Sequence, residues 1–207
     1  MNDDRFLIFD LGGVLIDWNP RYLYREIFAD EAKMEFFLNQ VCTPAWNAQM
    51  DLNKSFKDAA DELKMSYPEY TAQIQIWYDR WEEMIGGPIT GTVEILKEIM
   101  QSGYPLAALS NWSAETFPIA NRKYDFLSWF THVVISGEVG LVKPDPKIFH
   151  LLLEAINRDP DDCIFIDDTQ ENIQIAKELG FEGILFSSPL QLRDQLEHLG
   201  VLQDGRG

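Results

Sequence analysis

Side chains able to act as nucleophiles, acids or metal ligands follow short apolar runs at three places in this chain of 207 residues. Asp10 follows the run at residues 6–9, Ser110 follows a second run, and Asp167 and Asp168 follow a third. A short continuous apolar run is typical of a strand buried on both faces of a parallel sheet. Because parallel strands end at one edge of their sheet, we expect these groups to meet in one crevice.

A lysine adds a positive charge to this set. Lys143 lies in the segment 140–146, before a predicted helix, and we expect it at the same edge of the sheet. Each group alone has a plainer explanation: Asp10 as a turn residue before glycine, Ser110 as a helix cap, and the acidic pair as favourable charge at a helix start. Because several roles of one site are filled together, the catalytic interpretation is favoured.

Strands and helices alternate around these groups. The predicted strands are residues 6–9, 104–109, 132–135, 163–166 and 183–186, and the predicted helices are residues 92–100, 113–124, 147–156, 171–179 and 190–199. Helices of this length between strands imply βαβ units. The sequence therefore predicts an α/β fold with a Rossmann-like, mostly parallel sheet.

Residues 21–84, between the first two strands of this sheet, have apolar positions at helical spacing and no strand signal. Pro20 suits the first position of a helix, with Asn19 as its cap. The stretch 69–84 is expected to form one long helix. The expected domains are an all-helical cap of four or five helices at residues 17–87 and an α/β catalytic core at residues 1–16 and 88–207.

Acidic residues outnumber basic ones, and the formal net charge is −17. No basic run suggests a nucleic-acid partner, and no apolar run is long enough to span a bilayer. The polar start at residues 1–4 argues against a signal peptide. Cys42 and Cys163 are too few for a disulfide framework and suit buried thiols in a reducing compartment. We expect a cytoplasmic monomer or homodimer with no membrane partner.

The order of these motifs resembles that of the haloacid dehalogenase superfamily, in the branch with a helical cap inserted after the first strand. Asp10 matches the family's first motif, Ser110 the second, Lys143 the third, and Asp167 with Asp168 the fourth. The resemblance covers nearly the whole chain. It implies a phosphatase-like hydrolase in which Asp10 is the nucleophile and forms an aspartyl-phosphate.

The resemblance also implies a Mg²⁺ cofactor and a phosphate-binding set. The metal ligands would be Asp10, the main-chain carbonyl of Gly12 and Asp168, with Asp167 either a further ligand or a supporting group behind the ligands. Lys143 would neutralise the phosphoryl charge and the nucleophile. Ser110 and the amide of Asn111 would bind phosphoryl oxygens.

Position 12 departs from the family pattern. Phosphatases of this superfamily usually carry a second Asp two residues after the nucleophile, which protonates the leaving group, and this chain has Gly12 there. Some sugar-phosphate phosphatases of the superfamily also have a non-acidic residue at this position. Asp17 or residues of the cap are possible sources of the missing proton.

The expected function is Mg²⁺-dependent hydrolysis of a small phosphorylated metabolite, with sugar phosphates among the candidates. A closed helical cap would exclude macromolecules, and Asn19 and Trp46 are the cap residues that we expect to contact the substrate. One alternative is a metal-independent 2-haloacid dehalogenase with the same nucleophile. Its fourth motif is neutral, whereas two carboxylates beside Asp10 are costly without a cation. A second alternative is a non-catalytic binding protein, which Gly12 favours.

Overall fold

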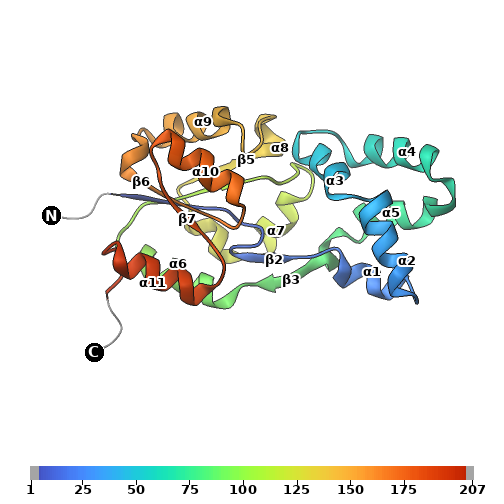
Figure 1. Ribbon diagram of the computed structural model, residues 1–207, viewed down its shortest axis with the longest axis horizontal. Coiled ribbons are helices and arrows are strands. Elements are labelled where there is room, and N and C mark those ends of the chain that lie inside the picture. Colours follow the sequence, from blue (N-terminus) through green and yellow to red (C-terminus); the bar gives the residue numbers. More distant parts are fainter. Residues whose placement is uncertain (1–4, 204–207) are drawn as a thin grey trace.

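The computed structural model describes residues 5–203 and contains a five-stranded parallel sheet with the strand order β5-β4-β1-β6-β7 (Figure 1). The strands are β1 (Phe6–Phe9), β4 (Leu106–Ser110), β5 (His132–Ile135), β6 (Cys163–Asp167) and β7 (Glu182–Leu185). Every neighbouring pair is parallel. The predicted α/β class and parallel sheet are confirmed, whereas the residues used to argue against a signal peptide, 1–4, lie outside the described part.

Strand β1 is buried because both faces of the sheet are covered. Successive side chains of a strand point to opposite faces, and here Leu7 and Phe9 join one apolar cluster while Phe6 and Ile8 join another. Helices α6 (Thr90–Gln101) and α11 (Pro189–His198) cover the first face, and α9 (Pro146–Ile156) and α10 (Gln170–Leu179) cover the second (Figure 1). The uninterrupted apolar run therefore belongs to the centre of the core.

Two details of the core differ from the prediction. The helix expected at residues 113–124 begins only at Phe117, as α7 (Phe117–Lys123), because Ser113 opens a turn in which its hydroxyl accepts a hydrogen bond from the Glu115 N–H at 3.1 Å. A short helix, α8 (Ser136–Val139), follows β5 and was not predicted.

Cys42 and Cys163 are both buried and unpaired. Among residues 5–203, no helix is long and apolar enough to cross a bilayer.

Residues 21–84, which lie between β1 and β4, are mostly helical, as predicted. The helical elements are α1 (Arg21–Ile27), α2 (Glu31–Phe36), a π-helical turn (Phe37–Val41), α3 (Pro44–Asp51), α4 (Phe56–Ser66), a 3₁₀ turn (Pro68–Tyr70), α5 (Thr71–Asp79) and a second 3₁₀ turn (Trp81–Met84). We call residues 21–84 the helical insert. The single helix predicted at 69–84 is wrong, because Arg80 leaves helical geometry, with φ −122° and ψ 27°, and pairs with Glu26 and Glu83.

The ends of the insert are joined by two short strands that the sequence did not predict. β2 (Ile16–Trp18) pairs antiparallel with β3 (Ile85–Pro88). The prediction that residues 17–87 are all helical is therefore wrong at both ends of that range. Gly86 allows this close pairing, because a Cβ there would lie 2.4 Å from Asp17 Oδ2 and 2.7 Å from the Tyr22 ring. The two passages of the chain between core and insert are thus held together.

Candidate active site

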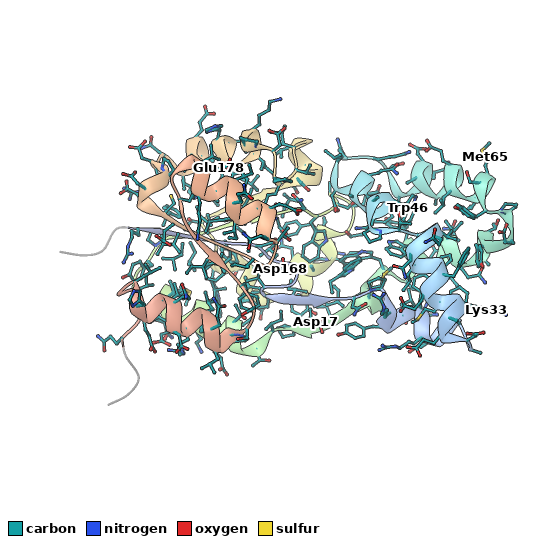
Figure 2. All side chains as sticks on the ribbon, in the orientation of Figure 1. Asp17, Lys33, Trp46, Met65, Asp168 and Glu178 are labelled. Carbon is teal, nitrogen blue, oxygen red and sulfur yellow. The ribbon has the colours of Figure 1, made fainter. Side chains whose placement is uncertain are left out.

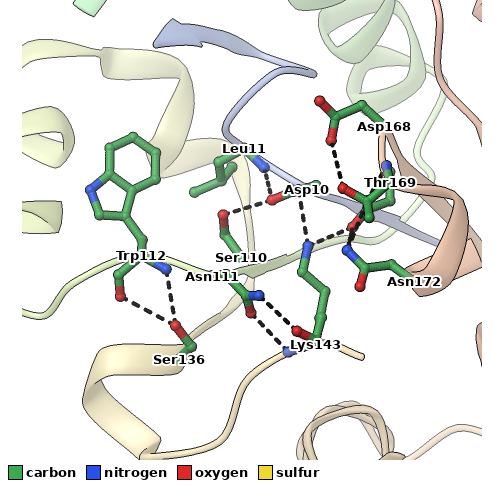
Figure 3. A network of polar contacts seen from close by, with 11 residues as sticks. Asp10, Leu11, Ser110, Asn111, Trp112, Ser136, Lys143, Asp168, Thr169 and Asn172 are labelled. Carbon is green, nitrogen blue, oxygen red and sulfur yellow. Dashed lines mark hydrogen bonds and ion pairs between the residues drawn. The ribbon is translucent and has the colours of Figure 1, made fainter. Parts of the chain in front are cut away.

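Three neighbouring strands bring the predicted site residues together at one edge of the sheet (Figure 3). Asp10 follows β1 directly, Ser110 is the last residue of β4, and Asp167 is the last residue of β6. The Asp10 N–H donates a hydrogen bond to the Ile166 carbonyl at 2.8 Å, which extends the β1–β6 pairing to the site itself. The convergence expected from the sequence is therefore present in the structure.

The Asp10 carboxylate is held by three donors. Its Oδ1 accepts hydrogen bonds from Ser110 Oγ at 2.6 Å and from the Leu11 N–H at 2.7 Å, and its Oδ2 lies 3.0 Å from Lys143 Nζ. Burial raises the pKa of Asp10 to about 7, against the lowering effect of the Lys143 charge. The carboxylate is thus held in one orientation at the edge of the sheet.

Lys143 is buried between two carboxylates. Its Nζ lies 2.6 Å from Asp167 Oδ2, and the lysine side chain is 1% exposed. Burial disfavours the ammonium, but the charges of Asp10 and Asp167 outweigh burial and raise the pKa of Lys143. The ammonium is therefore retained as a fixed positive charge.

The side chain of Asn111 holds the backbone of Lys143, a role that sequence reasoning missed. Asn111 Nδ2 donates to the Lys143 carbonyl at 2.9 Å, and the Lys143 N–H donates to Asn111 Oδ1 at 2.8 Å (Figure 3). Such a pair of bonds fixes the loop that carries the lysine. The sequence offered no signal for it, because residues 111 and 143 are far apart in the chain.

Asp167 and Asp168 differ in their surroundings. Asp167 is fully buried and accepts hydrogen bonds from Lys143 and from the Thr169 N–H, the latter at 2.8 Å. Asn172 Nδ2 lies 3.0 Å from each of its two carboxylate oxygens and donates to them. Asp168 is exposed, and the Thr169 hydroxyl donates a hydrogen bond to it at 3.4 Å. Asp167 is thus engaged in holding Lys143, whereas Asp168 has lone pairs free for a ligand.

The turn after Asp10 requires glycine at one position only. Gly13 has φ +74°, and a Cβ there would lie 2.1 Å from Asp168 Oδ2. Gly12 has neither restriction, because nothing lies within 4 Å of a Cβ built on it. The absence of a side chain at position 12 is therefore not imposed by the backbone.

The acidic residues fit a divalent cation. One ligand atom each from Asp10, Asp167 and Asp168 lies within 4.8 Å of the others, and Lys143 is the cation that contacts them. Three carboxylates and one ammonium leave a formal charge of −2, and carboxylate oxygens are the ligands that Mg²⁺ prefers. The donor set and its charge suit such an ion.

A cavity of about 180 Å³ lies beside this cluster, between the core and the helical insert. Its lining includes Gly12 from the turn after Asp10 and Asn111 next to Ser110. The remaining lining residues are Trp18, Asn47, Asp51, Phe56, Trp81, Trp112, Ser113 and Thr116. The volume is below the roughly 300–1,000 Å³ of pockets for drug-sized ligands, so the cavity suits a small molecule with aromatic walls around it.

The two residues predicted to contact substrate do not line this cavity. Asn19 Oδ1 accepts a hydrogen bond from the Arg21 N–H at 3.0 Å, just before α1, where Pro20 and not the predicted Asn19 is the N-cap residue. Trp46 lies in the helical insert (Figure 2). It packs edge-on against Trp77, and its indole N–H donates a hydrogen bond to the Ala59 carbonyl at 3.3 Å. Asn47, the next residue, faces the cavity instead.

Comparison with known proteins agrees with this geometry. A family model described as haloacid dehalogenase-like hydrolase matches residues 5–180. This chain belongs to that family. The fold is that of the HAD family enzyme bt-2542 from Bacteroides thetaiotaomicron, crystallised with magnesium, with a TM-score of 0.70 and 21% identity over 90% of this chain and 94% of that one.

Two curated relatives extend the comparison. The chain is 24% identical to a phosphorylated carbohydrates phosphatase of Thermotoga maritima over 86% of this chain and 82% of that protein. It is 29% identical to the drimenol cyclase drtB of Aspergillus calidoustus over 94% of its own length but only 36% of the cyclase. The chain thus spans well under half the length of some curated relatives that it matches.

Proposed function

We propose that this hydrolase is a Mg²⁺-dependent phosphatase of small phosphomonoesters, with sugar phosphates among the candidate substrates. The observation that carries the proposal is the cluster at the sheet edge: an oriented Asp10, a buried Lys143 and an exposed Asp168, with a formal charge of −2. The phosphatase from Thermotoga maritima and the magnesium complex of bt-2542 support it by similarity.

Asp10 would attack phosphorus, because Ser110 and the Leu11 N–H already orient its carboxylate. Lys143, Ser110 Oγ and the Asn111 N–H would bind phosphoryl oxygens. Asp10, Asp168 and the Gly12 carbonyl would hold the metal ion, and Asp167 would keep Lys143 in place. When bound, Mg²⁺ supplies positive charge that reduces repulsion between the nucleophile and the phosphoryl group.

We propose that residues 17–87 act as a cap on a catalytic core of residues 1–16 and 88–207. The support is the cavity, to which β2, α3, α4 and the 3₁₀ turn 81–84 contribute walls from the insert side. Because the cavity is small, a small alcohol is the leaving group that fits. Retention in the cytoplasm and the oligomeric state stay predictions.

The dehalogenase alternative is less favourable physically. Asp167 and Asp168 add two negative charges beside the nucleophile, which would repel a haloacid carboxylate in the absence of a cation. A panel of phosphorylated metabolites and 2-chloropropionate, assayed with Mg²⁺ and with EDTA, tests the choice. Phosphate release that requires Mg²⁺ and is lost in Asp10→Asn supports the proposal. Halide release in EDTA would support the dehalogenase, and no turnover of any ester would support the binding protein.

A further inference from the structure

A phosphatase of this kind needs a proton for the alcohol that leaves. With phosphorus at Asp10, the alcohol must lie in a hollow next to this residue, and the cavity lined by Gly12 and Asn111 borders the turn after Asp10. Gly12 has no side chain to donate a proton. Among the described residues that line the cavity, Asp51 is the only one with an acidic or basic side chain.

The position of Asp51 follows from the two faces of α3. Residues four apart lie on the same side of a helix. Trp46 and Met50 are buried in the insert on one side, whereas Asn47 and Asp51 line the cavity on the other. The cavity face of α3 is therefore the polar face, and its only ionisable group is Asp51.

No group in the described part of the chain compensates the charge of Asp51. Its side chain has no hydrogen bond or ion pair there, although it is partly buried. The nearest lysine in sequence, Lys54, pairs with Glu62 and Gln49. On the segments packed around α3, Glu115 accepts a hydrogen bond from the Phe56 N–H and Glu138 is exposed. Both of these neighbours are acidic, so neither neutralises the carboxylate of Asp51.

Stability does not explain this placement. Asp51 is the last residue of α3, and a negative charge at a helix C-terminus opposes the helix dipole. Burial without a partner raises the pKa of Asp51 to about 6. An acid with a pKa close to the working pH is effective in proton transfer.

We propose that Asp51 is the general acid and base of this enzyme, supplied by the insert in place of a carboxyl at position 12. The inference rests on the proposed phosphatase function. In the first step an Asp10 oxygen bonds to phosphorus, the P–O ester bond breaks, and the proton of Asp51 passes to the ester oxygen to give the free alcohol. In the second, the Asp51 carboxylate takes a proton from water, the water oxygen bonds to phosphorus, and the Asp10–phosphorus bond breaks to release phosphate.

The other polar residues near the cavity are less suited to this role. Asp17 accepts a hydrogen bond from the Tyr22 hydroxyl and does not line the cavity. The Thr116 hydroxyl accepts a hydrogen bond from the Trp112 indole at 3.1 Å, and an alcohol is too weak an acid at neutral pH. Within residues 5–203, the carboxyl of Asp51 is the one acid on the cavity wall.

The test compares Asp51→Asn with the parent on an alkyl phosphate and on p-nitrophenyl phosphate, with Mg²⁺ present. General acid–base catalysis contributes about 10²–10⁴-fold, so kcat/KM for the alkyl phosphate should fall by that order. p-Nitrophenolate leaves without a proton, so its rapid burst should remain while its steady-state turnover falls. Asp58→Asn, an exposed acid of α4, is the control and should keep parental rates.

A second variant separates catalysis from folding. Gly12→Asp has room for its side chain on the same cavity wall and should restore much of the lost alkyl-phosphate activity when combined with Asp51→Asn. If Asp51→Asn retains the parental kcat/KM on the alkyl phosphate, or loses the burst with p-nitrophenyl phosphate to the same extent, the inference is wrong. If the parent hydrolyses no phosphomonoester, the proposed function fails first and the role of Asp51 fails with it.

Discussion

Replacing Lys143 by methionine tests how the site is held together. The ammonium lies 2.6 Å from Asp167 Oδ2 and 3.0 Å from Asp10 Oδ2, with 1% of the side chain exposed. Removing one partner of a buried ion pair costs about 3–5 kcal/mol, because the other charge stays buried without a partner. At about 2–4 °C of Tm per kcal/mol for a chain of this size, the expected loss is about 6–20 °C.

The assay is thermal unfolding followed by circular dichroism in the absence of metal. Lys123→Met is the matched control, because Lys123 pairs with Glu82 at 2.7 Å on the surface, where a salt bridge contributes at most about 1 kcal/mol. Lys143→Met should also lose phosphatase activity while it retains native secondary structure below its Tm. A Tm equal to that of Lys123→Met would refute the reasoning that Lys143 compensates the two buried carboxylates.

Three further predictions follow from the site. Asp168→Asn should abolish the rise in Tm that Mg²⁺ gives the parent, which is worth about 2.7 kcal/mol at a metal concentration of 100 Kd; an undiminished rise would remove Asp168 from the ligands. Gly13→Ala should cost about 1–3 kcal/mol through its left-handed backbone and its clash with Asp168, whereas Gly12→Ala should be close to neutral. Because the folded-state pKa of Asp51, about 6, lies above the ordinary value of 3.8, the folded protein binds more protons between these values and this residue lowers stability as pH rises from about 4 to about 6. Asp51→Asn should therefore be at least as stable as the parent at pH 7 in urea unfolding, and a lower stability would indicate a structural role.

The central sheet and the meeting of its polar groups could be predicted from the sequence. Four consecutive apolar residues before Asp10 leave little choice other than a doubly covered strand, and parallel topology then places Asp10, Ser110 and Asp167 at one edge. These features depend on local patterns together with one rule of topology.

Features set by long-range packing could not be predicted. The helical spacing of apolar residues continues past Arg80, yet the helix ends there. Arg80 pairs with Glu26, which is distant in the sequence, and with the nearby Glu83, and the sequence pattern does not reveal these ion pairs. The sequence predicts a helix at α3 but not which of its faces meets the cavity. It therefore favours Trp46 as a substrate contact, whereas the neighbouring Asn47 lines the cavity. In the sequence, Asp51 is an ordinary polar residue at the end of a helix. Only the folded chain shows that it lines the cavity.

The most direct test of phosphoryl transfer to Asp10 is mass spectrometry of the acid-quenched enzyme during turnover of p-nitrophenyl phosphate. With Mg²⁺, the peptide that contains Asp10 should gain the mass of one phosphoryl group, and Asp10→Asn should show no such gain. A phosphoryl group on another residue, or parental turnover in EDTA with no modification of the Asp10 peptide, would contradict the proposed mechanism.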